Sequence, residues 1–533
     1  MSPNEDSPAP SAFPKIHPAI AIVFVTLLMA ALTLYRLGAA DVCGGNEAVE
    51  GVFVQQMVEH GKALFPRENG TVPMYKPPLF HWTALAIDRA AGITRVTAAN
   101  LRFPSALYAT AGTAITMLFA GDVLGADGAI LAGLALAGSY QYVEEGRYGR
   151  VDMTLAFFET LALFAFVWWM PSDPGAAGAR ARDESNPAAL YLMALAMGLG
   201  VLAKGPVGAF IPGVSILAFM IAARRARQII AMLDPGAIIL GAVVASGWYL
   251  ACYVAGQTDF LHRQLGAENA GRFFGELGAM APWYYVKPIL LNSAPESLLV
   301  PIAAAAALWG RFRRAPDEPS NGNAQSPGAS ARRAPDAILL LAIFWVVTIG
   351  FFTIAAYKRR AYLLPLWPAA AVMIAWWTVT LPWADYRRIA IRGLATICCA
   401  AAAFNFFYIP HAEIQSCGGD SYRPAAREIT RAIGPGAPLY LYGFHEEVAP
   451  LLFYLDRDAP ILKGRLGDAP PGDIVVPRAV WKAHRDGASG LTPVLTSDHG
   501  SRHLVVVTRG KSLADENRSA PLLRRRYAAF AVR

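Results

Sequence analysis

The sequence predicts an all-α polytopic membrane domain followed by a soluble α/β domain at its C-terminal end. Of its 533 residues, 55% are hydrophobic and only 16% are charged, whereas soluble domains carry about 25% charged residues. Long apolar runs recur between Pro18 and Pro410, each close to the roughly 20 residues with which a helix crosses about 30 Å of hydrocarbon. After about residue 411 the composition changes, and helix-like pieces alternate with strand-like pieces.

We expect eleven membrane spans, and up to thirteen if short apolar segments also enter the bilayer. Leu79–Ala91 is such a segment, and the alternative for it is a helix on the lipid surface. No A-x-A-like cleavage site follows the first run, so we interpret that run as a retained span rather than a signal peptide. The expected spans are 19–37, 103–123, 127–142, 152–170, 188–203, 206–223, 235–255, 285–309, 336–356, 361–381 and 388–408.

The distribution of arginine predicts the orientation. Four arginine clusters lie in loops that eleven spans place on one side, and cytoplasmic loops carry the excess of basic residues. This also explains the net charge of +8 better than nucleic-acid binding does. We expect a bacterial inner-membrane protein with a cytoplasmic segment 1–18, a membrane domain 19–410 with periplasmic loops 38–102, 143–151 and 256–284, and a periplasmic domain 411–533. The clusters are Arg180 and Arg182; Arg224, Arg225 and Arg227; Arg311, Arg313, Arg314, Arg332 and Arg333; and Arg387, Arg388 and Arg392.

Two further segments have a predicted structure. The loop Pro316–Pro335 is rich in Pro, Ser, Asn, Gly and Arg, which predicts disorder. In the tail we expect helices at 424–432 and 446–454, and strands at 438–442, 473–477 and 504–508. Cys43 and Cys417 both fall on the oxidising side, which leaves a disulfide between them open. The five cysteines have no metal-ligand spacing.

The functional candidates are charged residues on the outer side, where topology does not explain them. Glu47 begins a predicted helix 47–61 after Gly44-Gly45-Asn46, and Lys76 lies between prolines that restrict its backbone. The alternatives are a carboxylate favoured by the helix dipole and a solvated interface lysine.

Other outer loops add more charge. Glu144, Glu145, Arg147 and Arg150 precede Asp152, which begins a span, and a mutually neutralised loop is the alternative.

Lys204 stands before a Gly-Pro break, with interfacial snorkelling as the alternative. Lys358, Arg359 and Arg360 precede Tyr362 in a short outer loop. Glu268, Arg272 and Glu276 recur every fourth residue, which predicts one helix face, and an ordinary salt-bridged surface helix is the alternative.

These cations on one side of the membrane suit a lipid phosphate or pyrophosphate. A carboxylate among them could act as a general base on an acceptor hydroxyl. There is no Walker motif and no G-x-G-x-x-G, so a lipid-linked donor is more sensible than a nucleotide.

The order of the motifs resembles the polyprenyl-phosphate-dependent glycosyltransferases. Over about residues 35–410 the chain is most similar to the bacterial lipid A aminoarabinose transferases, and more distantly to the protein O-mannosyltransferases. The motifs that carry the resemblance are Asn46-Glu47, Lys76-Pro77-Pro78-Leu79, Arg102-Phe103-Pro104-Ser105-Ala106, Asp152-Met153, Leu202-Ala203-Lys204-Gly205-Pro206, Glu268 to Phe273, Trp283-Tyr284-Tyr285 and Lys358 to Pro365.

The resemblance implies a GT-C fold and transfer of a sugar from a polyprenyl-phosphate carrier to a lipid, glycan or protein acceptor. The expected reaction is that of an inverting hexosyl- or pentosyltransferase. It implies Glu47 as the catalytic carboxylate and Lys76 as a ligand of the donor phosphate. The chain departs from the family pattern at Asn46, Val49 and Tyr75, where the family usually has Asp, Arg and Glu. Arg147 or Arg150 would then replace the lost arginine.

The resulting hypothesis assigns roles to three groups of residues. It requires no cofactor; a divalent cation is allowed, but no cluster of ligands demands one. Besides membrane lipids, the expected partners are the polyprenyl-phosphate sugar and its acceptor, and no nucleic acid. A transporter or flippase of an anionic lipid, and an inactive relative, are the alternatives. The groups are catalytic Glu47 and Asp152; donor-phosphate-binding Lys76, Lys204, Lys358, Arg359, Arg147 and Arg150; and substrate-binding Asn46, Tyr75, Glu268, Arg272 and Tyr362.

Overall fold

The computed structural model describes residues 13, 17–171, 178–276, 278–291, 297–303, 305, 329–433, 438–444, 448–455 and 457–509. The chain forms two compact units. The first comprises 1–37, 75–83 and 102–409, and the second comprises 38–74, 84–101 and 410–533. The expected loop 316–335 lies outside the described residues except for its last seven, which are helical.

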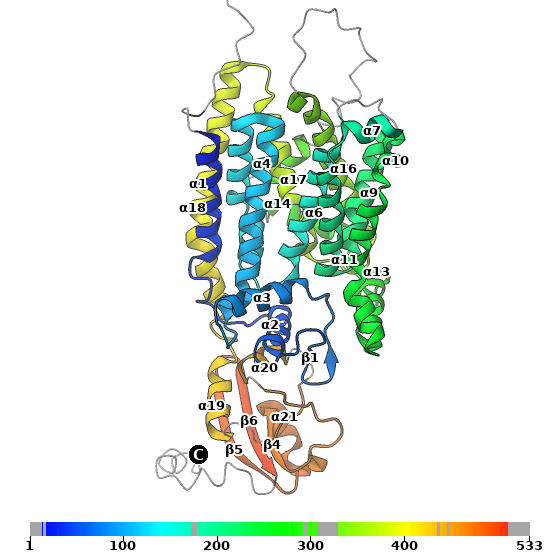
Figure 1. Ribbon diagram of the computed structural model, residues 1–533. Helices are drawn as coiled ribbons and strands as arrows, with labels where there is room; N and C mark the ends of the chain where they lie inside the picture. Colours follow the sequence, from blue (N-terminus) through cyan, green and yellow to red (C-terminus); the bar gives the residue numbers. More distant parts are fainter. Residues whose placement is uncertain are drawn as a thin grey trace, which may run out of the picture. The chain divides into compact units, whose positions relative to one another are not determined.

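The first unit is a bundle of apolar helices (Figure 1). Within the described ranges, six helices are long and apolar enough to cross a membrane, and three further apolar helices are shorter. The long helices are α4 (Ala98–Gly138), α6 (Val151–Trp169), α8 (Pro187–Lys204), α11 (Pro235–Val254), α16 (Ala329–Ile354) and α18 (Ala384–Cys417). The shorter ones are α1 (Pro18–Leu34), α9 (Val207–Ala222) and α17 (Leu366–Val379).

Helix α4 consists of two pieces that fold back on each other. Gly125 has φ of +79°, which interrupts the helix and suits a residue without Cβ. A Cβ on Gly133 would lie 2.5 Å from the sulfur of Met117, and one on Gly121 would lie 3.5 Å from Ala129. Residues equally far from Gly125 therefore meet, so α4 supplies the two spans that were predicted at 103–123 and 127–142.

Small residues let three helices of the bundle approach closely. A Cβ on Gly208 of α9 would lie 2.2 Å from the backbone of Gly200 in α8, and one on Gly198 would lie 2.9 Å from the carbonyl of Gly241 in α11. Such glycine contacts are the usual means of close packing between membrane helices. They fix the C-terminal end of α8, which carries Lys204.

The shorter elements of the first unit connect these helices. They include the π-helix η2 (His262–Gly271), which is followed directly by α13 (Arg272–Phe274). The expected span 285–309 is described only in part, by α14 (Val286–Leu291) and the helical residues 297–303. The others are α5 (Tyr140–Glu145), α7 (Gly178–Glu184), α10 (Ile229–Met232), α12 (Thr258–Leu261) and the 3-10 turns Ala226–Gln228, Pro282–Tyr285 and Arg360–Leu363.

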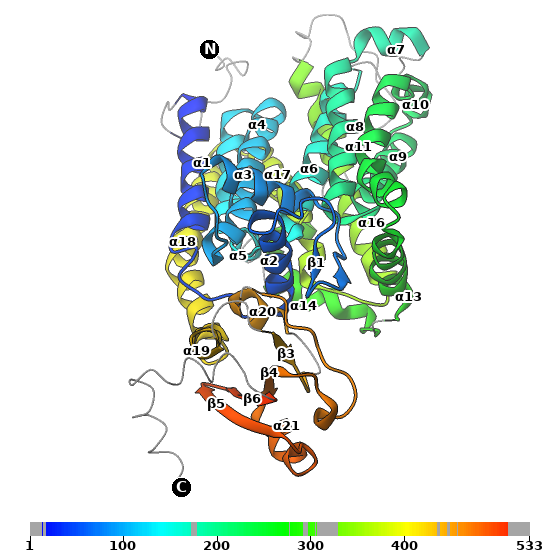
Figure 2. The ribbon, with the colours of Figure 1, turned by 60° about the horizontal axis from the view of Figure 1, so that its bottom comes forward.

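The second unit contains a mixed four-stranded sheet of order β3-β4-β6-β5 (Figure 2). β3 (Leu439–Leu441) is parallel to β4 (Gly472–Pro477), whereas β5 (Leu491–His499) and β6 (Arg502–Arg509) add antiparallel pairs. Ile474, Val476, Val505 and Val507 form part of its apolar core. The predicted strands 438–442, 473–477 and 504–508 are present, and β5 was not predicted.

Helices complete the second unit. α19 (Arg423–Ile433) and α20 (Ala449–Leu455) correspond to the two helices predicted in the tail, and α21 (Arg478–His484) was not predicted. The segment 38–101 contributes α2 (Gly45–Val58) and the two-residue strands β1 (Arg67–Glu68) and β2 (Val72–Pro73). α3 (Leu79–Ala90) is the helix expected at 79–91.

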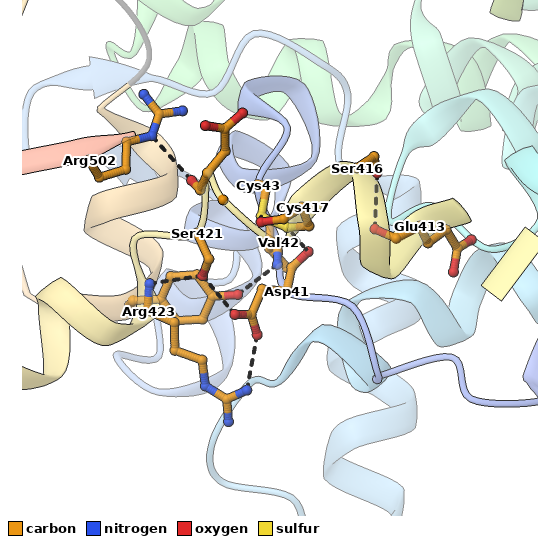
Figure 3. Close-up of a disulfide and its surroundings, with 12 residues drawn as sticks. Asp41, Val42, Cys43, Glu413, Ser416, Cys417, Ser421, Arg423 and Arg502 are labelled. Atoms are coloured by element: carbon orange, nitrogen blue, oxygen red, sulfur yellow. Dashed lines mark hydrogen bonds and ion pairs between the residues drawn. A yellow bond between two sulfur atoms is a disulfide. The ribbon is translucent and has the colours of Figure 1, made fainter. Parts of the chain in front are cut away.

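Residues 38–74 and 84–101 form one compact unit with the tail. Gln55 of α2 donates to the carbonyl of Phe453 at 2.9 Å, and Asn69 exchanges two hydrogen bonds with Ala459. Cys43 and Cys417 form a disulfide (Figure 3). The disulfide left open by the sequence is therefore confirmed.

Candidate functional site

A pocket of about 320 Å³ in the first unit brings together residues from five separate segments. Its polar part has three cations, Lys76, Lys204 and Arg272, with Glu268. Its apolar part has the phenylalanines 210, 273, 274, 351 and 352. Such a division into a cationic part and an apolar part matches a phosphate attached to a hydrocarbon chain.

Lys76 is held in a buried position between Tyr75 and Pro77. Its ammonium donates to Glu268 Oε2 at 3.0 Å and lies 5.2 Å from the centre of the Tyr75 ring. Burial lowers the pKa of Lys76 to about 8, against the opposing attraction of Glu268. The ammonium is thus poorly solvated, and an anion in the pocket would stabilise its charge.

Glu268 orients two of the three cations. The same oxygen that accepts from Lys76 also lies 2.6 Å from Nη2 of Arg272. The two residues lie four apart, as predicted, at the end of η2 and the start of α13. Glu276 does not continue that face, because Gly275 ends α13 in the left-handed conformation. A π-helix at this position is consistent with a functional site.

The loop 355–357 contacts both the backbone and the guanidinium of Arg272. Tyr357 N donates to the Arg272 carbonyl at 3.1 Å, and Ala356 N donates to the Phe273 carbonyl at 3.0 Å. The guanidinium lies 5.3 Å from the centre of the Tyr357 ring. Burial opposes its charge, but Glu268 nevertheless raises the pKa of Arg272, so this guanidinium stays a fixed positive charge.

Lys204 forms an ion pair with Asp152, and both side chains are about nine-tenths buried. The ammonium also lies 4.5 Å from the centre of the Tyr362 ring, and the Tyr362 hydroxyl accepts from Arg272 at 3.4 Å. Tyr362 therefore links two cations of the pocket. Gly205, with φ of +101°, ends α8, and a Cβ there would lie 3.2 Å from Asn269.

The apolar part of the pocket, which forms a wall of phenylalanines, was not predicted from the sequence. Phe351 lies between Phe210, at 5.3 Å, and Phe273, at 5.4 Å, and Phe352 lies 4.7 Å from the Tyr362 ring. The Phe-Phe pairs at 273–274 and 351–352 are the feature of the sequence that could have indicated this apolar wall. They flank the charged motifs of two outer loops.

Four of the predicted phosphate ligands do not line this pocket. Lys358 donates to the carbonyls of Ala355 and Met280, at 2.6 and 3.3 Å. Arg147 is fully buried and donates to three carbonyls at the end of α1, those of Leu32, Thr33 and Tyr35. Both side chains thus hold backbone in place, and their contact with phosphate stays a prediction.

The remaining two arginines surround the acidic residues of the second outer loop. Arg150 lies 3.7 Å from Glu145, and Arg359 interacts electrostatically with Asp152. Arg360, which was not among the predicted site residues, pairs with Glu144 at 2.7 Å. The basic triplet 358–360 is thus explained by buried partners. Burial raises the pKa of Glu145.

Two further predicted residues, Asn46 and Glu47, lie on α2 of the second unit. Glu47 is in the first turn of that helix and is buried, whereas Asn46 is exposed. Arg102 and Ser105 of the R-x-P-S-A motif have structural roles, since they donate to the carbonyls of Leu37 and Arg150. Over the ranges that are described, no three His, Cys, Asp or Glu side chains gather as metal ligands would.

The fold is that of the GT-C class. The crystal structure of ArnT from Cupriavidus metallidurans bound to undecaprenyl phosphate superimposes with a TM-score of 0.74, at 16% identity, over 93% of this chain and 99% of that chain. The Archaeoglobus fulgidus oligosaccharyltransferase superimposes with a TM-score of 0.54, at 13% identity, over 86% of this chain and 69% of that chain.

Within this class, the chain resembles the aminoarabinose transferases and the O-mannosyltransferases, as expected. Residues 75–249 match the family model described as dolichyl-phosphate-mannose-protein mannosyltransferase. The undecaprenyl phosphate-alpha-4-amino-4-deoxy-L-arabinose arabinosyl transferase of Pectobacterium carotovorum is 25% identical over 69% of this chain and 61% of its own length. An uncharacterized protein of Aquifex aeolicus is 24% identical over 66% of this chain and 63% of its own length. The chain therefore spans somewhat over 60% of the length of these two relatives. This likeness and the apolar helices support a multi-pass inner-membrane protein.

Proposed function

We propose that the chain transfers a sugar from a polyprenyl-phosphate carrier to a hydroxyl or phosphate oxygen of a lipid, glycan or protein acceptor. The observation that supports this most directly is the pocket in which Lys76, Lys204 and Arg272 stand beside five phenylalanines. The cations would hold the carrier phosphate, and the phenylalanine wall would take the first units of its chain.

In the proposed reaction the acceptor oxygen attacks the anomeric carbon while the bond between that carbon and the carrier phosphate breaks. The electron pair of the broken bond leaves with the phosphate, whose added charge the three cations would stabilise. Fixed cations in a buried site need no rearrangement at that moment. A single displacement of this kind inverts the configuration at the anomeric carbon.

A carboxylate is needed where the acceptor is a hydroxyl, to receive its proton. The motif order assigns this role to Glu47, and Asp152 would hold Lys204 in position rather than act on the acceptor. Asn46 and Tyr75 would contact the substrates at the sites where the family carries acidic residues. The sugar would be a hexose or a pentose.

The proposed location of the reaction is the periplasmic face, with a cytoplasmic N-terminus. The Cys43–Cys417 disulfide supports this orientation, because disulfides persist in the periplasm and not in the cytoplasm. The arginine clusters of the opposite loops support it independently.

The test is an assay of sugar transfer from radiolabelled polyprenyl-phosphate donors to envelope lipid and protein fractions. We expect transfer by the purified chain and loss of transfer in Glu47→Gln, with carrier-phosphate binding retained. Full transfer by Glu47→Gln would contradict the catalytic assignment. Carrier binding without transfer in every fraction would favour the inactive relative, and movement of an intact anionic lipid across liposomes would favour the transporter.

A further inference from the structure

A second pocket, of about 440 Å³, lies entirely within the second unit. Its walls come from the chain around Asp41, the segment 95–99, the start of α19 and the end of α20. None of its lining residues was among the site residues predicted from the sequence.

The charge of this pocket is strongly unbalanced. Its lining includes three guanidiniums, those of Arg95, Arg423 and Arg427, and one carboxylate, that of Asp41. Asp41 is already engaged, since it lies 3.0 Å from Arg423 and accepts from Ser421 at 2.6 Å (Figure 3). Arg427 has no ion-pair partner among the residues that the structure describes.

The arrangement of the arginines favours a common ligand. Arg423 and Arg427 lie four residues apart on α19, which places them one above the other on the same face of the helix. Arg95 comes from the loop before α4, so the cations converge from two separate parts of the chain. All three arginines are exposed, so solvent screens their mutual repulsion, and their head groups are accessible to an anion that enters the pocket.

The walls of the pocket are fixed by covalent and polar contacts. The disulfide of Cys43 holds the chain beside Asp41, and Val42 N donates to the Tyr454 hydroxyl at 2.6 Å (Figure 3). Gln55 donates to the carbonyl of Phe453 at 2.9 Å. Phe453 and Tyr454 also line the pocket, so an aromatic surface stands beside the arginines.

We propose that this pocket binds an anionic carbohydrate, with its phosphate or carboxylate on the guanidiniums and its ring beside Phe453 and Tyr454. Guanidinium groups match both anions with paired hydrogen bonds, and aromatic side chains offer apolar area together with a polar tip. The volume lies within the roughly 300–1,000 Å³ of small-molecule sites. The inference does not depend on the donor chemistry, because the two pockets share no residue.

The test is calorimetric titration of the full-length protein in detergent with glucose 1-phosphate, glucuronate and glucose. We expect saturable binding of one or both anions, at least tenfold tighter than that of glucose. Arg427→Gln should weaken anion binding about tenfold and Arg95→Gln similarly. The matched control is Arg431→Gln, which removes the same charge from the same helix outside the lining and should leave the affinity unchanged.

The two anions distinguish the possible ligands. Tighter binding of glucose 1-phosphate indicates a phosphorylated sugar, and tighter binding of glucuronate indicates a sugar with a carboxylate. Equal binding of glucose, no binding of any of the three, or an equal loss in Arg431→Gln would overturn the proposal. Binding of phosphatidylglycerol in nanodiscs but of neither sugar anion would also overturn it, in favour of a lipid headgroup. Undecaprenyl phosphate binding, measured on the same variants, should be unchanged and verifies that each one is folded.

Discussion

The carboxylate of Glu268 accepts a hydrogen bond from the ammonium of Lys76 at 3.0 Å. This pair joins the first outer loop to a helix almost two hundred residues later in the chain, and the same oxygen also lies beside Arg272. One carboxylate thus positions two cations while leaving the pocket with an excess of positive charge.

Affinity for the carrier phosphate should fall as the pH rises through about 8. The pKa of Lys76 is lowered to about 8, so the ammonium is present below that pH and lost above it. Above pH 8, binding of the phosphate requires that Lys76 also takes up a proton. Titration of undecaprenyl phosphate between pH 6 and 10 measures this, with up to tenfold loss per pH unit. Lys76→Arg should flatten the profile, because a guanidinium stays charged. A wild-type profile that is flat to pH 10 would refute this role.

Glu268→Gln should move that loss of affinity to lower pH. The Glu268 charge raises the Lys76 pKa against burial, so its removal lowers the pKa further below 8 and leaves less ammonium at pH 7.5. We expect at least threefold weaker phosphate binding at that pH and a smaller difference at pH 6. The matched control is Glu276→Gln, which lies outside the lining. An unchanged pH midpoint would show that Glu268 does not control Lys76.

The Lys204–Asp152 pair predicts a pattern of non-additive stability. Both side chains are about nine-tenths buried, and breaking a buried pair from one side costs about 3–5 kcal/mol. Asp152→Asn and Lys204→Met should each lower the thermal unfolding midpoint in detergent. The double variant should lose less than the two single losses combined, because no uncompensated charge remains. Additive losses would show that the two groups act independently.

Gly208→Ala should destabilise the protein and weaken carrier binding together. Its Cβ would lie 2.2 Å from the backbone of Gly200, so α8 and α9 must separate, at a cost of about 1–3 kcal/mol or more. The displacement would reach Lys204 at the end of α8. Gly247→Ala in α11 is the control, since nothing lies within 4 Å of its Cβ. The outcome is read from thermal unfolding and phosphate titration, and equal behaviour of both variants would contradict the packing.

The disulfide predicts a change in thiol count on reduction. The chain has five cysteines, of which Cys43 and Cys417 are joined. Denatured protein should therefore react with maleimide-polyethylene glycol at three sites before reduction and at five after it, as counted by gel shift. Cys43→Ser should show four sites in both states and unfold about 2–4 kcal/mol more easily. Five reactive sites in unreduced protein from the envelope would place these residues outside an oxidising compartment.

The elements that depend on local composition could be predicted from the sequence. The spans followed from apolar length, the tail helices 424–432 and 446–454 from their composition, and the strands near 473–477 and 504–508 from apolar character. The pairing of Glu268 and Arg272 followed from their spacing of four residues. These properties need no partner from elsewhere in the chain.

Which charged residues meet depends on how the helices and loops pack. Lys358 and Arg359 are adjacent in sequence, yet Lys358 turns to backbone carbonyls while Arg359 lies near Asp152. Arg147 resembled a phosphate ligand, but its neighbours are the carbonyls at the end of α1. The phenylalanine wall and the arginine pocket of the second unit were likewise not predicted, although the Phe-Phe pairs at 273–274 and 351–352 are visible in the sequence. A long charged side chain pairs with whichever acceptor the packing brings near, because an unsatisfied charge in a buried site is too costly to persist. The role of such a side chain is therefore set by contacts between segments that are distant in the chain.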